Sequence, residues 1–297
     1  FEEETIERTM IVLGTPLGKE RELTGVDVEA LLQMASVVES GLPIEALLQL
    51  VRVYAQSVRR IADAEVRLFH LFVHEPMIRD GLGQVEMAEA LGEVVQSTSP
   101  VAVPLFEYLH RRYVRYFMEQ DVVGHMEDEF GGGEDIGEVR ITLCFIDLTG
   151  FTRITEEEGD AEAYSVIEQF TDTVEATLPP EANVVKTIGD EVMVVSSDAS
   201  SLTEWSVGFL SLFDDRPKPR VGIHYGAAVF RDGDYFGGQV NLAHRVVNRA
   251  LGGEVLVTGP VAQTIEEHPD LELDGIGEVV LKGFPEPTPL YLVSGRD

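Results

Sequence analysis

Apolar residues recur at helical spacing through the first part of the chain. Over residues 26–40 they stand at Val28, Leu31, Leu32, Ala35 and Val38. One apolar residue in every three or four is typical of an amphipathic helix. The same spacing from 44 to 73 predicts a longer helix that Pro76 ends, and further helices are expected at 85–96 and 101–123. The first part is therefore predicted to be all-helical.

The pattern changes near residue 138, where shorter strand-like and helix-like apolar runs begin to alternate. Strand-like runs cover 139–146, 183–196 as a hairpin, 220–230, 254–258, 271–281 and 289–293. Helix-like runs cover 160–178, 201–213, 240–251 and 259–268. A β-α-β-β-α-β order predicts an α+β fold with a ferredoxin-like sheet.

An acidic segment with three consecutive glycines, MEDEFGGGEDIG, separates the two patterns. Glycine-rich segments are flexible, so a domain boundary is expected there. The predicted organisation is an all-helical domain over 1–125, a linker over 126–137 and an α+β domain over 138–297. The linker is either a simple tether or a hinge that transmits a signal.

Composition narrows the class of protein. The chain has 297 residues, 44% of them hydrophobic and 25% charged, as in an ordinary globular protein. No apolar run approaches the roughly 18 residues that cross a bilayer, and the first residues do not resemble a secretory signal. The single cysteine, Cys144, cannot form an intrachain disulfide. A cytoplasmic protein is expected.

The net charge of −31 is shared by both parts of the chain. Nucleic acids and anionic membranes are bound through cationic surfaces, so neither partner is expected. A nucleotide would also be repelled overall. It would need bound metal and a local cationic pocket.

Two aspartates stand where strand-like runs end. Asp147 follows such a run in FIDLTGF, and Asp190 lies in the glycine turn of KTIGDE. Magnesium is commonly held by a few carboxylates together with substrate phosphate oxygens, so the pair is a candidate metal site. Taken singly, Asp147 is better explained as a helix N-cap and Asp190 as a hairpin-turn residue, and only their pairing within this set of motifs favours a metal site.

A third segment, DYFGGQVNLAHR, carries an acid, an amide and a guanidinium: Asp234, Asn241 and Arg245. Asn241 and Arg245 are four residues apart in a predicted helix, so they share one face. The alternative explanation is that this face is an ordinary polar helix surface, on which Arg245 forms an ion pair.

These segments, in the order FIDLTGFT, KTIGDE, RVGIHYG, DYFGGQVNLAHR and VVLKGF, resemble the catalytic domain of class III nucleotidyl cyclases. The resemblance extends from Gly137 to the C-terminus. The helical part is similar, more loosely, to the regulatory domain that precedes this module in some actinobacterial adenylyl cyclases, including acid-responsive ones.

The resemblance implies an adenylyl cyclase that converts ATP to 3′,5′-cyclic AMP and pyrophosphate. Asp147 and Asp190 would bind two Mg²⁺ or Mn²⁺ ions, with the backbone carbonyl of Ile146 as a further ligand. Lys186 and Asp234 match the positions that read adenine. Asn241 would orient the ribose, and Arg245 would stabilise charge on the α-phosphate.

In this family the metal-binding and base-reading residues face each other across a subunit interface. One chain here carries both sets, so the resemblance implies a head-to-tail homodimer with two equivalent sites. Two alternatives stay open. A guanylyl cyclase is disfavoured by Lys186 and Asp234, and a silent nucleotide-binding module is disfavoured because all six positions expected for metal binding, base reading and catalysis are filled.

Two features depart from the family pattern or lack a role. Some members have an arginine where Ala227 stands, so the cations that hold the triphosphate are incompletely identified, with Lys282 as one candidate. In or near the helical part lie four histidines, His70, His74, His110 and His125. Because histidine titrates near neutral pH, acid sensing is one hypothesis for this part. Binding of a lipid-like ligand among the long apolar helices is the other.

Overall fold

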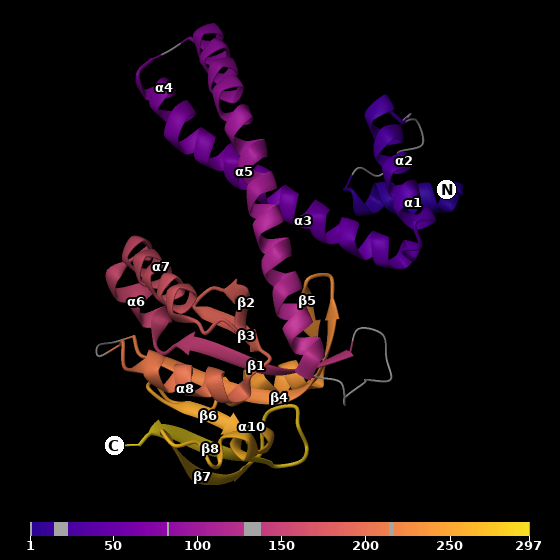
Figure 1. Ribbon diagram of the computed structural model, residues 1–297. Coiled ribbons are helices and arrows are strands. Elements are labelled where there is room, and N and C mark those ends of the chain that lie inside the picture. The colour runs from indigo at the N-terminus through magenta and orange to yellow at the C-terminus, as the bar shows by residue number, and fades with distance from the viewer. Residues whose placement is uncertain (1, 15–22, 82, 128–137, 214–216, 297) are drawn as a thin grey trace. The chain divides into compact units, whose positions relative to one another are not determined.

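A computed structural model describes residues 2–14, 23–81, 83–127, 138–213 and 217–296. The chain divides into two compact units, Phe1–Val122 and Val123–Asp297 (Figure 1). Most of the predicted linker, residues 128–137, lies outside the described part. The functional boundaries at 125 and 138 therefore stay a prediction.

The described part of the first unit is helical, as predicted. A small apolar core forms where α1 and α2 pack on the start of α3, with Met10, Leu31 and Leu48 buried. The N-terminus of α2 is closed by a capping box, in which Thr24 and Asp27 exchange hydrogen bonds with each other's backbone N–H groups. The elements are α1 (Glu3–Val12), α2 (Gly25–Glu39), α3 (Ile44–Phe69), the π-helical turn η1 (His70–His74), α4 (Glu75–Arg79) and α5 (Gln84–Glu127).

Two predicted helix ends in this unit are wrong. The helical path does not stop at Pro76, because this proline lies in the first turn of α4, where a missing N–H is tolerated. Nor is the next helix divided between 96 and 101. Helix α5 continues through Pro100 and Pro104. Proline fixes φ near a helical value, so a long helix can continue past it at the loss of a backbone hydrogen bond.

The second unit is built on a mixed sheet in the order β2-β3-β1-β4-β6-β8-β7, with β5 paired to β4 (Figure 1). The first four strands pair antiparallel in the order β2-β3-β1-β4, which is the predicted ferredoxin-like arrangement. The strands are β1 (Glu138–Leu148), β2 (Ala182–Ile188), β3 (Glu191–Ser196), β4 (Pro219–Arg231), β5 (Asp234–Phe236), β6 (Val255–Thr258), β7 (Leu271–Val279) and β8 (Thr288–Gly295). Only the short β5 was not predicted.

The two faces of the sheet bury different side chains. Alternate β1 residues Cys144, Ile146 and Leu148 point into the larger core, with Phe170 of α7 and Phe209 of α8. The helices of this unit are α6 (Phe151–Glu158), α7 (Asp160–Thr177), α8 (Ala199–Leu210), α9 (Gly238–Val247) and α10 (Gly259–Ile265).

Helix α9 packs on the opposite face of the sheet, over Leu143 and Phe145 of β1. The approach of helix to sheet is close. A Cβ added at Gly222 of β4 would lie 2.2 Å from the backbone nitrogen of Val247. Because Asp147 follows Leu143 and Phe145 at alternate positions, it belongs to the face that α9 covers.

Among the described residues, no helix combines the length and apolar character that a membrane span requires.

Candidate active site

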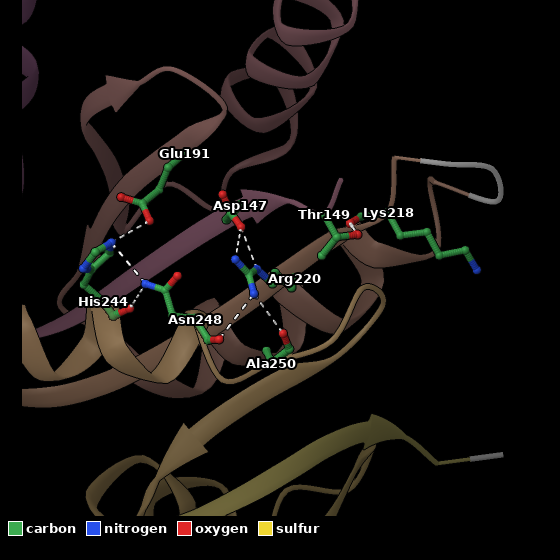
Figure 2. A network of polar contacts seen from close by, with 8 residues as sticks. All are labelled: Asp147, Thr149, Glu191, Lys218, Arg220, His244, Asn248 and Ala250. Atoms are coloured by element: carbon green, nitrogen blue, oxygen red, sulfur yellow. Dashed lines mark hydrogen bonds and ion pairs between the residues drawn. The ribbon is translucent and has the colours of Figure 1, made fainter. Parts of the chain in front are cut away.

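Strand register places three charged residues in one row across the sheet. Asp147 of β1 lies opposite Glu191 of β3 on one side and opposite Arg220 of β4 on the other. Directly opposed residues in an antiparallel pair point to the same face, so the three side chains gather beside α9. Figure 2 shows this row and the end of α9 next to it.

Arg220 forms the central contact of the row. Its Nε and Nη2 atoms both donate to Oδ2 of Asp147, at 2.6 Å and 2.5 Å. Its Nη1 atom donates to the backbone carbonyls of Asn248 and Ala250, at 3.4 Å and 3.2 Å, just beyond the end of α9 (Figure 2). The last carbonyls of a helix lack intrahelical partners, and a cation is favourable at this end. Arg220 therefore contacts both the carboxylate and the helix.

Asp190 joins Asp147 at the same edge of the sheet. It lies in the turn between β2 and β3, and its backbone carbonyl accepts a hydrogen bond of 3.3 Å from the N–H of Leu148. Burial raises the pKa of the Asp190 carboxyl, and the neighbouring Asp147 charge adds to the rise. Glu191 is affected more strongly: burial first, then Asp147 and Asp190, raise its pKa to about 7.

A divalent cation fits this edge on electrostatic grounds. Three carboxyl groups lie together with one guanidinium, and repulsion between their negative charges adds to burial in raising the pKa values of Asp190 and Glu191. Within the described ranges, however, no three His, Cys, Asp or Glu side chains converge closely enough to hold a metal ion by themselves. The donor set suits an ion that takes its remaining ligands from a bound nucleotide.

His244 of α9 approaches the row from the other side. Its Nε2 atom lies 3.1 Å from Oε2 of Glu191, and its ring centroid lies 5.3 Å from that of Phe145. Burial lowers the pKa of His244, and the nearby Arg245 charge lowers it further. The Nε2 atom also lies 3.3 Å from Nδ2 of Asn248, so the imidazole is held between Glu191 and the C-cap residue of α9.

Lys186 and Asp234 are brought together from elements 48 residues apart. The Lys186 ammonium on β2 donates to Oδ2 of Asp234 on β5, and the N–H of Tyr235 donates to Oδ1 at 2.8 Å. Both side chains keep partial exposure, 35% for Lys186 and 24% for Asp234. The pair thus offers a donor and an acceptor at an accessible position.

Asn241 and Arg245 lie on α9, as predicted, and neither is buried. Within the described part of one chain, neither side chain makes a hydrogen bond or ion pair with Asp147 or Asp190. The structure of a single chain therefore brings together the metal candidates as one group and the adenine candidates as another. It does not join either group to Asn241 and Arg245.

The remaining candidates occupy varied positions. The side chain of Ile146 is fully buried in the core. Only its backbone carbonyl could therefore serve as a metal ligand. Gly150 takes a left-handed conformation, φ 79°, at the turn that enters α6. Beside it, the hydroxyl of Thr149 donates to the carbonyl of Lys218 at 2.7 Å (Figure 2). Lys282 is exposed.

The sequence alone missed the roles of Arg220, Glu191 and His244 in this network. All three lie inside the motifs that were singled out, next to residues with assigned roles. Arg220 opens RVGIHYG, Glu191 closes KTIGDE and His244 precedes Arg245. The signal that could have found Arg220 is an arginine at the start of a strand that pairs with the strand ending in Asp147.

Known proteins place this geometry in a family. Residues 137–295 match the family model described as the adenylate and guanylate cyclase catalytic domain. An adenylate cyclase of Streptomyces griseus is 32% identical over 85% of this chain and 62% of its own length. A pH-sensitive adenylate cyclase of Mycobacterium tuberculosis is 29% identical over 83% of this chain and 62% of its own length.

This chain thus spans about 62% of the length of these two curated relatives. The crystal structure of the adenylyl cyclase CyaB from P. aeruginosa is 21% identical over 55% of this chain and 98% of its own, with a TM-score of 0.49. The resemblance to class III nucleotidyl cyclases is confirmed by the family match, which covers more than half of the chain. The chain belongs to the family of adenylate and guanylate cyclase catalytic domains.

Proposed function

We propose that this protein is an adenylyl cyclase that converts ATP to 3′,5′-cyclic AMP and pyrophosphate. The observation that carries the proposal is the contact between Lys186 and Asp234 in a chain that also gathers Asp147 and Asp190 at one edge of its sheet. A lysine can donate to purine N1, and a carboxylate can accept from the 6-amino group. Adenine presents this edge, and guanine presents the reverse.

Each candidate residue has a separate task in the proposed reaction. Asp147, Asp190 and the carbonyl of Ile146 would hold two Mg²⁺ or Mn²⁺ ions, which when bound neutralise the triphosphate and acidify the ribose 3′-hydroxyl. Asn241 would orient the ribose for in-line attack on the α-phosphate. Arg245 would donate to the phosphoryl oxygens as their charge rises.

Two chains are needed for one complete site in this proposal. Within the described part of a single chain, Asn241 and Arg245 make no hydrogen bond or ion pair with Asp147 or Asp190, whereas a second chain placed head to tail could supply them. Apolar side chains at every fourth position of α5 are also exposed, which favours association. They are Val101, Leu105, Leu109, Tyr113 and Phe117, each at least 40% exposed.

A mixing experiment tests the shared site. Asp147→Ala and Arg245→Ala chains should each be inactive alone, with rates at least about 100-fold below wild type. Mixed in equal amounts, they should recover part of the activity, because one site of a mixed dimer keeps both intact residues. Cyclic AMP formed from ATP with Mn²⁺ is the measurement. No recovery in a mixture that does form dimers would reject the shared site.

The two alternatives are separated by the same assay. A guanylyl cyclase would produce cyclic GMP from GTP faster than cyclic AMP from ATP. A silent nucleotide-binding module would bind ATP and release no cyclic product with either nucleotide.

We further propose that the helical part regulates the catalytic part, with protons as the signal. His70 and His74 lie at the ends of η1 with their Nδ1 atoms 2.9 Å apart. The Oε1 atom of Glu75 lies 3.9 Å from Nε2 of His70. Two protonated rings could not keep this contact, because both nitrogens would then be donors. The side chain of His125 lies outside the described residues.

Acid regulation is tested by the pH profile of cyclic AMP formation. His74→Gln should shift the profile relative to wild type, and an unchanged profile would dismiss this pair as the sensor. Extraction of the purified protein and mass spectrometry test the rival hypothesis, a bound lipid-like ligand.

A further inference from the structure

The guanidinium of Arg220 is placed between two functional groups of the proposed enzyme. On one side lies Asp147, whose carboxylate is the metal candidate of β1. On the other lies the C-terminal end of α9, the helix that carries Asn241 and Arg245 (Figure 2). The side chains of Arg220 and Asp147 are only 22% and 15% exposed, so water competes little for these hydrogen bonds.

The contact uses one oxygen of the carboxylate. Among the described residues, every hydrogen bond and ion pair to the Asp147 side chain ends on Oδ2. Oδ1 is therefore left for another partner. A guanidinium that binds one oxygen and is itself held by two carbonyls restricts rotation of the carboxylate, and it leaves the free oxygen at a defined position.

A second contact joins the same two parts of the chain. His244 of α9 lies 3.1 Å from Glu191, which is directly opposite Asp147 in the sheet. Helix α9 thus contacts the row of Asp147, Glu191 and Arg220 at two places. Arg220 contacts the C-terminal end of the helix, and His244, one turn earlier in the helix, contacts Glu191. The helix and the row should move as one body.

We propose that Arg220 is a positioning residue that ties the metal-binding carboxylate of Asp147 to α9. The inference rests on the proposed function, in which Asp147 serves one site of the dimer and α9 of the same chain serves the other. Arg220 therefore connects two half-sites carried by one chain. Metal binding at Asp147 steadies the helix that presents Asn241 and Arg245 to the second site.

The first test uses the wild-type protein and needs neither nucleotide nor turnover. Hydrogen exchange is measured with Mn²⁺ and with EDTA. Mn²⁺ should slow exchange at the end of β1 and also over residues 246–253, the segment that contains both carbonyls contacted by Arg220. Protection of the β1 end without protection of 246–253 would overturn the inference. No Mn²⁺-dependent protection at either segment would instead reject the metal site of the proposed function, and the inference with it.

The second test replaces the guanidinium with an ammonium. Arg220→Lys keeps the charge, but one ammonium cannot donate to Asp147 and to both α9 carbonyls in the planar arrangement of arginine. We expect kcat to fall about tenfold or more, the KM for ATP to change little, and the Mn²⁺ concentration for half-maximal rate to rise at least about threefold. Free Mn²⁺ measured by electron paramagnetic resonance without nucleotide should show the same weakening.

Arg249→Met is the matched control. It removes an exposed cation two residues beyond α9, and it leaves the Asp147 contact intact. Its kcat and Mn²⁺ midpoint should stay within about twofold of wild type. If Arg220→Lys also stays within twofold in both quantities, Arg220 has no positioning role, even though the wild type remains an active cyclase. If Arg220→Lys fails to fold, the hydrogen-exchange result on the wild type decides.

Discussion

Replacing Glu191 with glutamine should stabilise the metal-free protein at high pH and have a smaller effect at low pH. Glu191 lies in the carboxylate row with only 15% of its side chain exposed. Its pKa rises from an ordinary 4.5 to about 7 in the fold, first because of burial and then because of the charges of Asp147 and Asp190. The fold therefore favours the protonated carboxyl. This stabilising effect is complete below pH 4.5 and is lost as the pH rises through about 7.

The magnitude follows from the difference between the two pKa values. One pH unit corresponds to about 1.4 kcal/mol, so complete ionisation in the fold would cost about 3 kcal/mol relative to the unfolded chain. Water screens part of this charge, so we expect about 1–2 kcal/mol. Glutamine keeps the shape of the side chain and never ionises. The stability gained by Glu191→Gln should therefore grow by about this amount between pH 5 and pH 8.5.

The assay is urea unfolding in EDTA, followed by the fluorescence of Trp205. This is the single tryptophan of the chain, and it packs against Phe209 with ring centroids 4.8 Å apart. Its signal therefore reports on the catalytic unit alone. Glu175→Gln, at an exposed position of α7, is the control and should show no pH-dependent gain. The reasoning would be refuted if the difference in unfolding free energy between Glu191→Gln and wild type were the same at pH 5 and pH 8.5. Saturating Mn²⁺ should reduce the difference in unfolding free energy between Glu191→Gln and wild type, because the ion neutralises the negative charge at Asp147, Asp190 and Glu191.

Three further outcomes are expected. Asp234→Ala should lower kcat/KM for ATP at least about tenfold and reduce the preference for ATP over GTP, because Lys186 would lose its partner; equal loss with both nucleotides would contradict a base-reading role. Gly222→Ala should destabilise the catalytic unit by about 1–3 kcal/mol or more in urea unfolding, because its Cβ would meet the backbone of Val247 at 2.2 Å. Gly208→Ala, whose Cβ would meet nothing within 4 Å, should be neutral or stabilising, and equal losses in both variants would contradict the packing argument. Removal of divalent metal with EDTA should abolish cyclic AMP formation, and Mn²⁺ should restore it; activity that persists in EDTA would reject the metal role of Asp147.

Local pattern was sufficient for most of the fold in the second unit. Alternation and apolar runs identified the strands around Asp147 and Asp190 and the long helix α7, because each is long enough for its period to be recognised. The shorter α6, which follows Asp147, was not predicted as a helix-like run. Local pattern was misleading at Pro76, where it predicted a helix end, and between residues 96 and 101, where it divided α5 into two helices. The cost of a proline within a helix depends on its place in the turn and on what packs around it, and neither is visible in the sequence.

The sequence by itself determined the order of elements, the family motifs and the candidate chemistry of Lys186, Asp234, Asn241 and Arg245. Those features depend on residue type and spacing, which are local along the chain. Only the tertiary structure decided that Arg220 joins Asp147 to the end of α9 and that Glu191 meets His244. Strand register and helix placement bring together groups 73 and 53 residues apart, and these depend on how the whole sheet buries its two faces.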